Sequence, residues 1–139
     1  MKIVLDTNVF ISGIFFSGPP AEILKAWRSA KFQILFSPQI LEEYRLVAES
    51  LAEKYPKIDI IPIIDLFMVH GELIDVEEND EPVCEDPDDD KFIECAITGN
   101  CQIIVSGDKH LLQVSGHKGI TVLNPREFLD RCLKKIDSL

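Results

Sequence analysis

The amino-acid sequence predicts an α/β fold, a three-layer α/β/α sandwich with a central parallel sheet of about five strands. Short apolar runs alternate along the whole chain with segments of helical periodicity. The first run, Ile3-Val4-Leu5, is continuously apolar, as in a strand that is covered on both faces. Strands that alternate with helices form a parallel sheet with helices on both sides.

The bulk composition suits a globular protein. The chain has 139 residues, of which 46% are hydrophobic and 27% charged, and we expect one domain over 1–139. The most apolar stretch, residues 58–69, contains Asp59, Pro62 and Asp65, so no membrane span is expected. The first strand begins at residue 2, which predicts no signal peptide and a cytoplasmic protein. The four cysteines lack C-x-x-C spacing and are expected to be free thiols.

The net charge of −10 bears on the partners of the chain. It argues against broad electrostatic capture of nucleic acid, which needs a basic face. A cluster of carboxylates, in contrast, is stabilised by a divalent cation. Composition alone does not choose between an acidic surface and an acidic metal site.

The first half of the chain contains two strands and two helices that the sequence defines well. Residues 9–16 are apolar and lead into a Gly/Pro loop, and Pro20 suits the first turn of a helix that reaches about residue 31. Residues 32–36 form the second strand. Ser37 and Pro38 then start a helix, as N-cap and first residue, which ends near Tyr55-Pro56.

The helix that starts at Ser37 carries two glutamates with different surroundings. Its apolar stripe consists of Ile40, Leu41, Tyr44, Val47, Ala48 and Leu51. Glu42 points away from the stripe into water, whereas Glu43 lies about 90° from its centre, between core and solvent. Glu43 is therefore the one that can reach a cleft, although the helix dipole alone also favours an acid here.

A third helix is predicted over residues 59–70, with Asp59 as its cap, Pro62 in its first turn and Gly71 as its stop. Its apolar side is wider than one stripe requires, which fits either a partner surface or a well-buried helix. Together with the Phe15-Phe16 loop, this helix predicts a homodimer.

The second half of the chain continues the alternation. The predicted elements are a strand over 73–76, an acidic loop over 77–88, a helix over 89–99, a strand over 102–105, a short helix over 109–113, a strand over 120–123, and a final helix that Asn124-Pro125 caps and that extends to Ile136.

Three corners that carry Asp follow strands of the predicted sheet: Asp6-Thr7-Asn8, residues 86–90 and Ser106-Gly107-Asp108. The carboxyl ends of parallel strands share one edge, so we expect these corners to lie together. Each Asp alone also fits a helix cap. Gathered acids repel one another unless a cation is present, and oxygen ligands without nearby His or Cys suit Mg²⁺ or Mn²⁺.

Within the acidic run, Asp89 stands one helical turn before the packed residues and leans toward them. Asp86 and Asp88 are interpreted as loop and cap residues and Asp90 as solvated. Asp89 is therefore the acid of this corner that we expect in the site.

The order of the motifs resembles one known family. The matching segments are residues 4–9, Ser37-Pro38 followed by Glu43-Tyr44, Asp86-Pro87-Asp88-Asp89 with Ala96, residues 106–112 and residues 125–129. In these segments the chain resembles PIN-domain proteins of the toxin–antitoxin group. That resemblance implies a PIN-like sandwich and a ribonuclease that hydrolyses RNA with Mg²⁺ or Mn²⁺.

The resemblance also implies roles for particular residues. The catalytic and metal-binding acids would be Asp6, Glu43, Asp89 and Asp108, with Asn8 and Ser106 as supporting residues, although the family commonly has Thr where this chain has Ser106. A toxin of a type II system would also have an antitoxin protein as its partner. Lys91 and Lys109 are hypothesised to rim the site and position RNA phosphates, or else are ordinary surface lysines.

Two other classes of function remain open: a phosphatase or receiver-type domain, and a non-catalytic module. A haloacid-dehalogenase-type phosphatase needs Asp-x-Asp after the first strand, and Asn8 occupies the second Asp position. A receiver domain needs a central Asp and a late Lys that this arrangement does not supply. A non-catalytic binding or assembly module would keep the fold without the activity, and the charge of −10 favours it.

Overall fold

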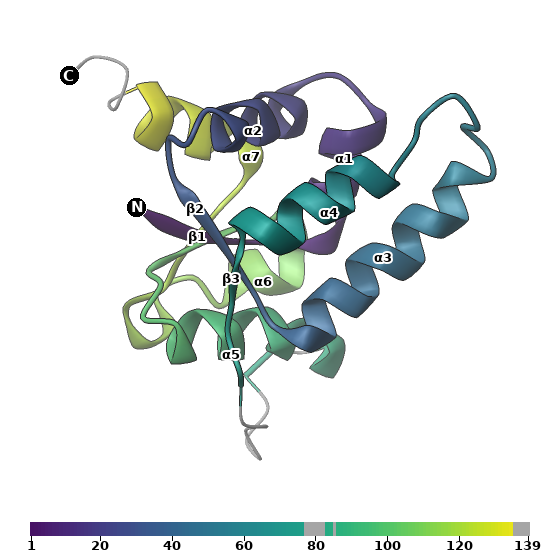
Figure 1. Ribbon diagram of the computed structural model, residues 1–139. Helices are drawn as coiled ribbons and strands as arrows, with labels where there is room; N and C mark the ends of the chain where they lie inside the picture. Colours follow the sequence, from purple (N-terminus) through teal and green to yellow (C-terminus); the bar gives the residue numbers. More distant parts are fainter. Residues whose placement is uncertain (77–82, 85, 135–139) are drawn as a thin grey trace.

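The computed structural model describes residues 1–76, 83, 84 and 86–134, and its centre is a five-stranded parallel sheet (Figure 1). The strand order is β3-β2-β1-β4-β5, and every neighbouring pair is parallel. The strands are β1 (Lys2–Leu5), β2 (Gln33–Phe36), β3 (Glu72–Leu73), β4 (Ile103–Val105) and β5 (Thr121–Leu123). The predicted α/β class with a parallel sheet of about five strands is confirmed.

Helices cover both faces of the sheet, which completes the three layers (Figure 1). The connections from β1 to β2 and from β2 to β3 cover one face with α1 (Thr7–Phe15), α2 (Pro19–Arg28), α3 (Pro38–Ala52) and α4 (Ile61–His70). The strand order then reverses, and α5 (Asp90–Thr98) and α6 (Lys109–Gln113) lie on the other face. Right-handed crossovers dictate this change of side. The chain returns to α2 through α7 (Pro125–Phe128) and a π-helical turn, η3 (Leu129–Leu133).

Several helix boundaries lie where capping residues in the sequence predict them. Ser37 caps α3 by accepting a hydrogen bond from the amide of Ile40, and Asn124 forms a capping box with Glu127. Gly71 follows α4 as predicted. Asp59 does not cap α4, because the helix begins at Ile61, although its side chain accepts a hydrogen bond from the Ile61 amide at 3.1 Å.

Three further elements differ from the sequence-based prediction. Residues 7–15 form helix α1, which the apolar run did not reveal. The strand β3 pairs only through Glu72–Leu73 rather than over 73–76, because it is an edge strand with one neighbour. The helix α3 ends at Ala52 instead of near Tyr55-Pro56. The predicted loop over 77–82 and 85 and the end of the last helix at Ile136 lie outside the described residues.

An aromatic cluster fills the space between the sheet and the helices on the α1–α4 side. Phe67 of α4 lies at its centre, with its ring 4.8 to 5.5 Å from four neighbours: Phe10, Trp27, Phe36 and Tyr44. Cys84, Cys95 and Cys101 are buried free thiols and Cys132 is half-buried, as expected. None of the described helices combines the length and apolarity needed to cross a membrane.

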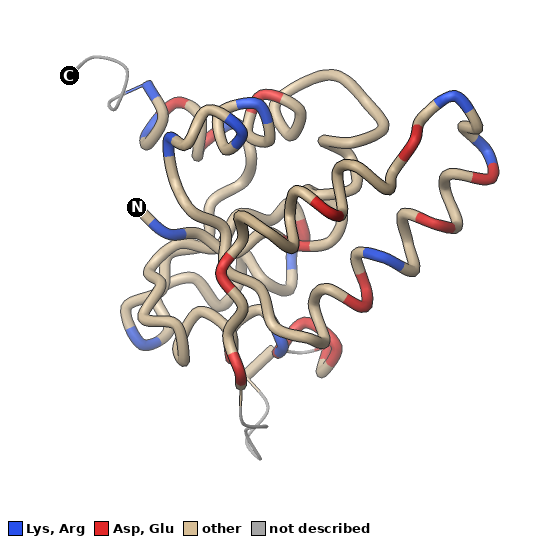
Figure 2. Tube along the Cα trace, in the orientation of Figure 1, with Lys and Arg blue, Asp and Glu red and all other residues tan. Residues whose placement is uncertain are grey.

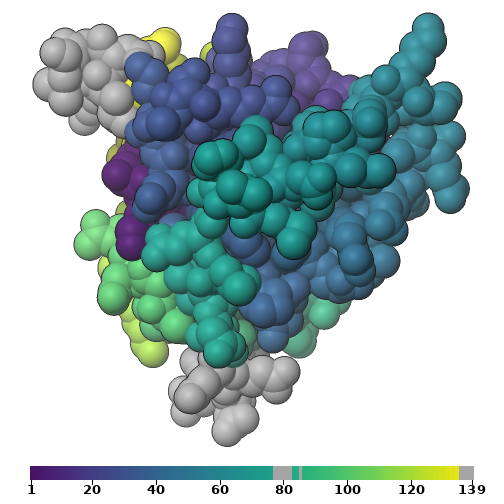
Figure 3. All heavy atoms as spheres, viewed as in Figure 1, coloured from purple at the N-terminus to yellow at the C-terminus, as the bar shows by residue number. Residues whose placement is uncertain are grey.

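The outer side of α4 stays on the surface of the molecule (Figure 3). Ile61, Met68 and Val69 are 65%, 56% and 74% exposed. Of the Phe15-Phe16 pair, Phe15 belongs to α1 and is buried, so only Phe16 adds apolar surface. The wide apolar side of α4 thus divides into a buried half and an exposed half.

Candidate metal centre

Asp6 lies where the strand order of the sheet changes direction, between the carboxyl ends of β1 and β4. Ligand sites of open α/β sheets form in the crevice at such a switch point. The Asp6 amide continues the ladder by donating to the carbonyl of Val105 at 3.0 Å. The carbonyl of Leu5, one residue earlier, accepts a hydrogen bond from the buried hydroxyl of Tyr44. The backbone that carries Asp6 is therefore held from both the neighbouring strand and α3.

Ser106 links the corner after β1 to the corner after β4. Its hydroxyl donates to Oδ2 of Asp6 at 2.6 Å and accepts from the backbone amide of Asp108 at 2.9 Å. Asp6 is 5% exposed and Ser106 is fully buried. Asp108 is half-buried and accepts a hydrogen bond from the amide of His110, which caps α6. One hydroxyl therefore fixes the relative position of two carboxylate-bearing corners.

Glu43 reaches the same region from α3, and both of its oxygens have partners. The Thr7 hydroxyl donates to Oε1, and the ammonium group of Lys91 pairs with Oε2. Its neighbour Glu42 is exposed and pairs with Arg45 at 2.8 Å. The two glutamates thus differ as their positions on the helix predict.

Asp89 occupies the N-cap position of α5 and is half-buried. Its Oδ2 atom is buried and has no hydrogen-bond partner within the described part of the chain. Burial, followed by the negative charges of Asp108, Asp86 and Asp6, raises the pKa of Asp89 from 3.8 to about 6. A carboxylate oxygen without a partner, surrounded by other carboxylates, is a position that a cation would stabilise.

The pKa of Asp6 is also raised. Burial is the largest cause, and the nearby charges of Asp108 and Glu43 add to it. The hydrogen bond from Ser106 opposes the rise, as does the backbone amide of Asn8, although Asp6 makes no capping hydrogen bond to α1. The corners after β1 and β4 and the starts of α3 and α5 therefore bring four carboxylates into electrostatic contact.

The remaining predicted residues occupy different positions around this cluster. The Asn8 side chain is exposed, so its influence on Asp6 comes from its backbone. Lys109 is exposed at the start of α6. Lys91 is only 18% exposed, and besides pairing with Glu43 it donates to the carbonyl of Asp88 at 2.6 Å. Lys91 is thus part of the cluster rather than a solvated surface lysine.

Asp90 corrects a sequence-based expectation. It is not solvated but half-buried, and its carboxylate accepts hydrogen bonds from the amides of Val83 and Cys84, the shortest at 2.7 Å. A carboxylate at the start of α5 can cap the approaching chain instead of facing water. Asp90 therefore anchors the segment before α5, and Asp89 is the acid of this corner that belongs to the carboxylate cluster.

The donor set fits a hard divalent cation in its chemistry. The four clustered acids and Ser106 offer carboxylate and hydroxyl oxygens, and among the described residues one of these carboxylate oxygens is buried without a hydrogen-bond partner. Within residues 1–76, 83, 84 and 86–134, no three His, Cys, Asp or Glu side chains are already close enough to hold one ion. The pairing of Lys91 with Glu43 is one reason why the acids are not arranged around one ion, because the ammonium group already neutralises one of the four carboxylates.

Metal-free stability should depend on pH through Asp89. Because its folded pKa is raised above the ordinary value, the native state binds more protons between pH 4 and 6, and stability falls as pH rises through this range. Asp89→Asn should therefore stabilise the metal-free protein by about 1 kcal/mol at pH 7, since water screens part of the repulsion, and by less at pH 4. Thermal unfolding with a chelator, using Asp88→Asn as the matched control, measures this; equal effects of both variants would contradict it.

Two comparisons with known proteins found similar sequences. A family model described as a PIN domain matches residues 2–110. The chain is also 31% identical over 148 aligned residues to the uncharacterized protein MJ1680 of Methanocaldococcus jannaschii. That alignment covers 98% of this chain and 94% of the relative. The matched region contains all four carboxylates of the cluster.

Proposed function

The chain belongs to the PIN-domain family, and from this membership we propose that it is a ribonuclease that depends on Mg²⁺ or Mn²⁺. The family has a nuclease-type fold. The observation that carries the proposal is the buried Oδ2 of Asp89, which lies beside three further carboxylates and has no hydrogen-bond partner in the part of the chain that the structure describes. Asp6, Glu43, Asp89 and Asp108 would hold the metal, with Ser106 and Asn8 as supporting residues.

The residues around the proposed metal site would have different roles in RNA hydrolysis. A bound divalent ion would lower the pKa of a water and stabilise the charge that develops on the leaving oxygen. Ser106 holds the Asp6 carboxylate in one orientation through a short hydrogen bond. Lys109 is exposed next to Asp108, where it would contact an RNA phosphate. Lys91 would do so after releasing Glu43, because its ammonium is already paired.

A non-catalytic binding module is the second candidate. Both oxygens of Glu43 already have partners in the chain, and the net charge of −10 disfavours a broad nucleic-acid interface. The two candidates differ in one property, since only a nuclease needs the cluster to bind a metal productively.

Cleavage of RNA tests the proposal directly. We expect the purified protein to cleave single-stranded or structured RNA with Mn²⁺ or Mg²⁺ and to lose this activity with a chelator. Mn²⁺ should also raise the unfolding temperature, because an ion that binds only the native state stabilises it. A thermal shift without cleavage of any RNA would favour the binding module. As a toxin of a type II system, the protein would have an antitoxin partner, which co-purification with the product of an adjacent gene would reveal.

The exposed side of α4 motivates a homodimer. Met68 and Val69 together with Ile61 present apolar surface that the rest of the described chain does not cover. We expect a dimer by light scattering at micromolar concentration and a shift toward monomer for Val69→Asp. A wild-type monomer at that concentration would remove this proposal.

A further inference from the structure

The ion pair between Lys91 and Glu43 joins the start of α5 to α3 at the carboxylate cluster. Figure 2 shows acidic positions in the first half of α3 and at the start of α5, with a basic position at the start of α5. The Lys91 side chain is 18% exposed, and its ammonium group lies against Oε2 of Glu43. The Thr7 hydroxyl donates to the other oxygen of Glu43. Lys91 therefore neutralises the proposed metal ligand that α3 supplies.

The ammonium group of Lys91 has two further contacts, and both lie within its own segment. It donates to the carbonyl of Asp88 at 2.6 Å and lies 5.1 Å from the centre of the Phe92 ring. Phe92 is 1% exposed, and the face of an aromatic ring attracts a cation. Neither contact involves Glu43, so both can persist when Glu43 leaves. The ion pair can therefore open without any displacement of α5.

An ammonium group and a divalent cation compete for the same negative charge. Asp6, Asp89 and Asp108 lie close enough to raise one another's pKa values, and the charge of Glu43 acts on Asp6 as well. In the metal-free protein Lys91 supplies one positive charge to this group of acids. A divalent cation at Glu43 would meet the repulsion of the ammonium at short range. One of the two cations must therefore leave Glu43.

We propose that Lys91 is an internal competitor of the divalent cation, which holds Glu43 in the metal-free protein and is displaced when the cation binds. This inference rests on the proposed function in one respect, namely that the carboxylate cluster is the metal site. The ammonium stabilises the gathered acids before metal binds and weakens the affinity for metal. Once displaced, it is available to an RNA phosphate, so that Lys91 contacts substrate only in the metal-loaded protein.

Lys91→Met tests the competition, because it removes the ammonium group and keeps a long apolar side chain beside Phe92. Calorimetry should show that Mn²⁺ binds this variant at least about tenfold more tightly than the wild type. The metal-free variant should unfold at a lower temperature, since the acids lose a counter-charge. Mn²⁺ should then raise its unfolding temperature by more than that of the wild type.

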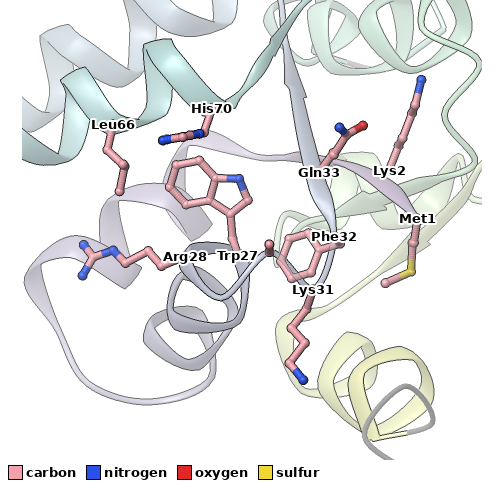
Figure 4. Close-up of a pocket in the computed structure, with 10 residues that line it drawn as sticks. Met1, Lys2, Trp27, Arg28, Lys31, Phe32, Gln33, Leu66 and His70 are labelled. Carbon is pink, nitrogen blue, oxygen red and sulfur yellow. The ribbon is translucent and has the colours of Figure 1, made fainter. Parts of the chain in front are cut away.

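Two control variants remove one positive charge elsewhere. Arg45 pairs at 2.8 Å with Glu42, the exposed neighbour of Glu43, so Arg45→Met removes a cation from α3 outside the cluster. Lys2 pairs with Glu72 at 3.4 Å and lies at the start of β1, beside a hollow at the amino ends of the strands (Figure 4). The carboxylate cluster follows the opposite, carboxyl ends. Arg45→Met and Lys2→Met should both keep the Mn²⁺ affinity within about twofold, because salt screens exposed and distant charges.

Chemical modification tests the displacement in the wild-type protein. An amine-reactive reagent, followed by mass spectrometry of the peptides, should modify Lys91 slowly without metal and several-fold faster with saturating Mn²⁺. Lys2, whose side chain is 43% exposed, is the internal reference and should react at the same rate in both conditions. Glu43→Gln, which cannot form the ion pair, should give the fast rate at Lys91 without metal.

The outcomes separate this inference from the proposed ribonuclease. An unchanged or weaker Mn²⁺ affinity of Lys91→Met, or a rate of Lys91 modification that Mn²⁺ does not change, would overturn the inference, and RNA cleavage by the wild type would still support the ribonuclease. Tighter Mn²⁺ binding by Lys91→Met in a protein that cleaves no RNA would support the inference and refute the ribonuclease. Absence of Mn²⁺ binding by both proteins would overturn the inference. If Lys91→Met does not fold without metal, the modification experiment decides.

Discussion

Asp6→Asn should lower Mn²⁺-dependent RNA cleavage by about a thousandfold, because a bound metal contributes several kcal/mol of charge stabilisation that a neutral amide cannot hold in place. The substitution keeps the size of the side chain and can still accept the hydrogen bond from Ser106. It also removes a buried charge, so the variant should unfold at no lower temperature than the wild type without metal. Initial cleavage rates at saturating Mn²⁺, together with unfolding temperatures, measure both parts.

A second acid and its neighbour provide the matched control. Asp89→Asn should lose cleavage to a similar extent, since among the described residues its Oδ2 is a buried carboxylate oxygen without a hydrogen-bond partner. Asp88→Asn, one residue earlier and exposed, changes the same charge and should keep at least about half of the activity, as expected for a surface substitution. Cleavage that survives in both Asp6→Asn and Asp89→Asn would locate the activity elsewhere or in a contaminant.

The sequence predicts the parallel sheet because its signals are local. The run Ile3-Val4-Leu5 is apolar without interruption, and all three side chains are fully buried. Ser37 and Asn124 specify helix starts through hydrogen bonds that span only three residues. Helix α1 was not predicted from the sequence. Asp6, its N-cap residue, makes no side-chain capping hydrogen bond, and the residues of α1 are apolar on most sides of the helix. A periodicity argument needs a polar face, and residues 7–15 lack a clear one.

The carboxylate cluster was predictable to a smaller extent. Strand ends in a parallel sheet must share an edge, which is why Asp6 and Asp108 could be placed together from sequence. The position of Glu43 on its helix predicted where its side chain points but not which groups it contacts. Its pairing with Lys91 joins residues far apart in the sequence, and the hydroxyl of Thr7 reaches it from α1, which was not predicted. Such contacts depend on how α1, α3 and α5 pack, and packing leaves no local signature.

Phe67→Ala should destabilise the protein by about 4 kcal/mol, a large part of the stability of a domain of this size. Phe67 is fully buried and its ring contacts four other aromatic rings, which the loss of the side chain would leave facing a cavity. Urea denaturation, with the midpoint and slope measured for both proteins, gives the difference in unfolding free energy. If the alanine variant fails to fold, Phe67→Leu should cost about 1–2 kcal/mol by the same measurement.

The aromatic cluster around Phe67 also connects stability to the proposed site. Tyr44 contacts Phe67 with its ring and holds the carbonyl of Leu5 with its hydroxyl, directly before Asp6. The matched control is Phe16→Ala, the same substitution at a phenylalanine that is 47% exposed, which should cost about 1 kcal/mol or less. Equal costs at Phe16 and Phe67 would mean that Phe67 is not the centre of the packing. In the other outcome only Phe67→Ala lowers the unfolding free energy strongly, and this variant cleaves RNA again when Mn²⁺ stabilises its fold. That result would show that the aromatic cluster supports the site only through folding.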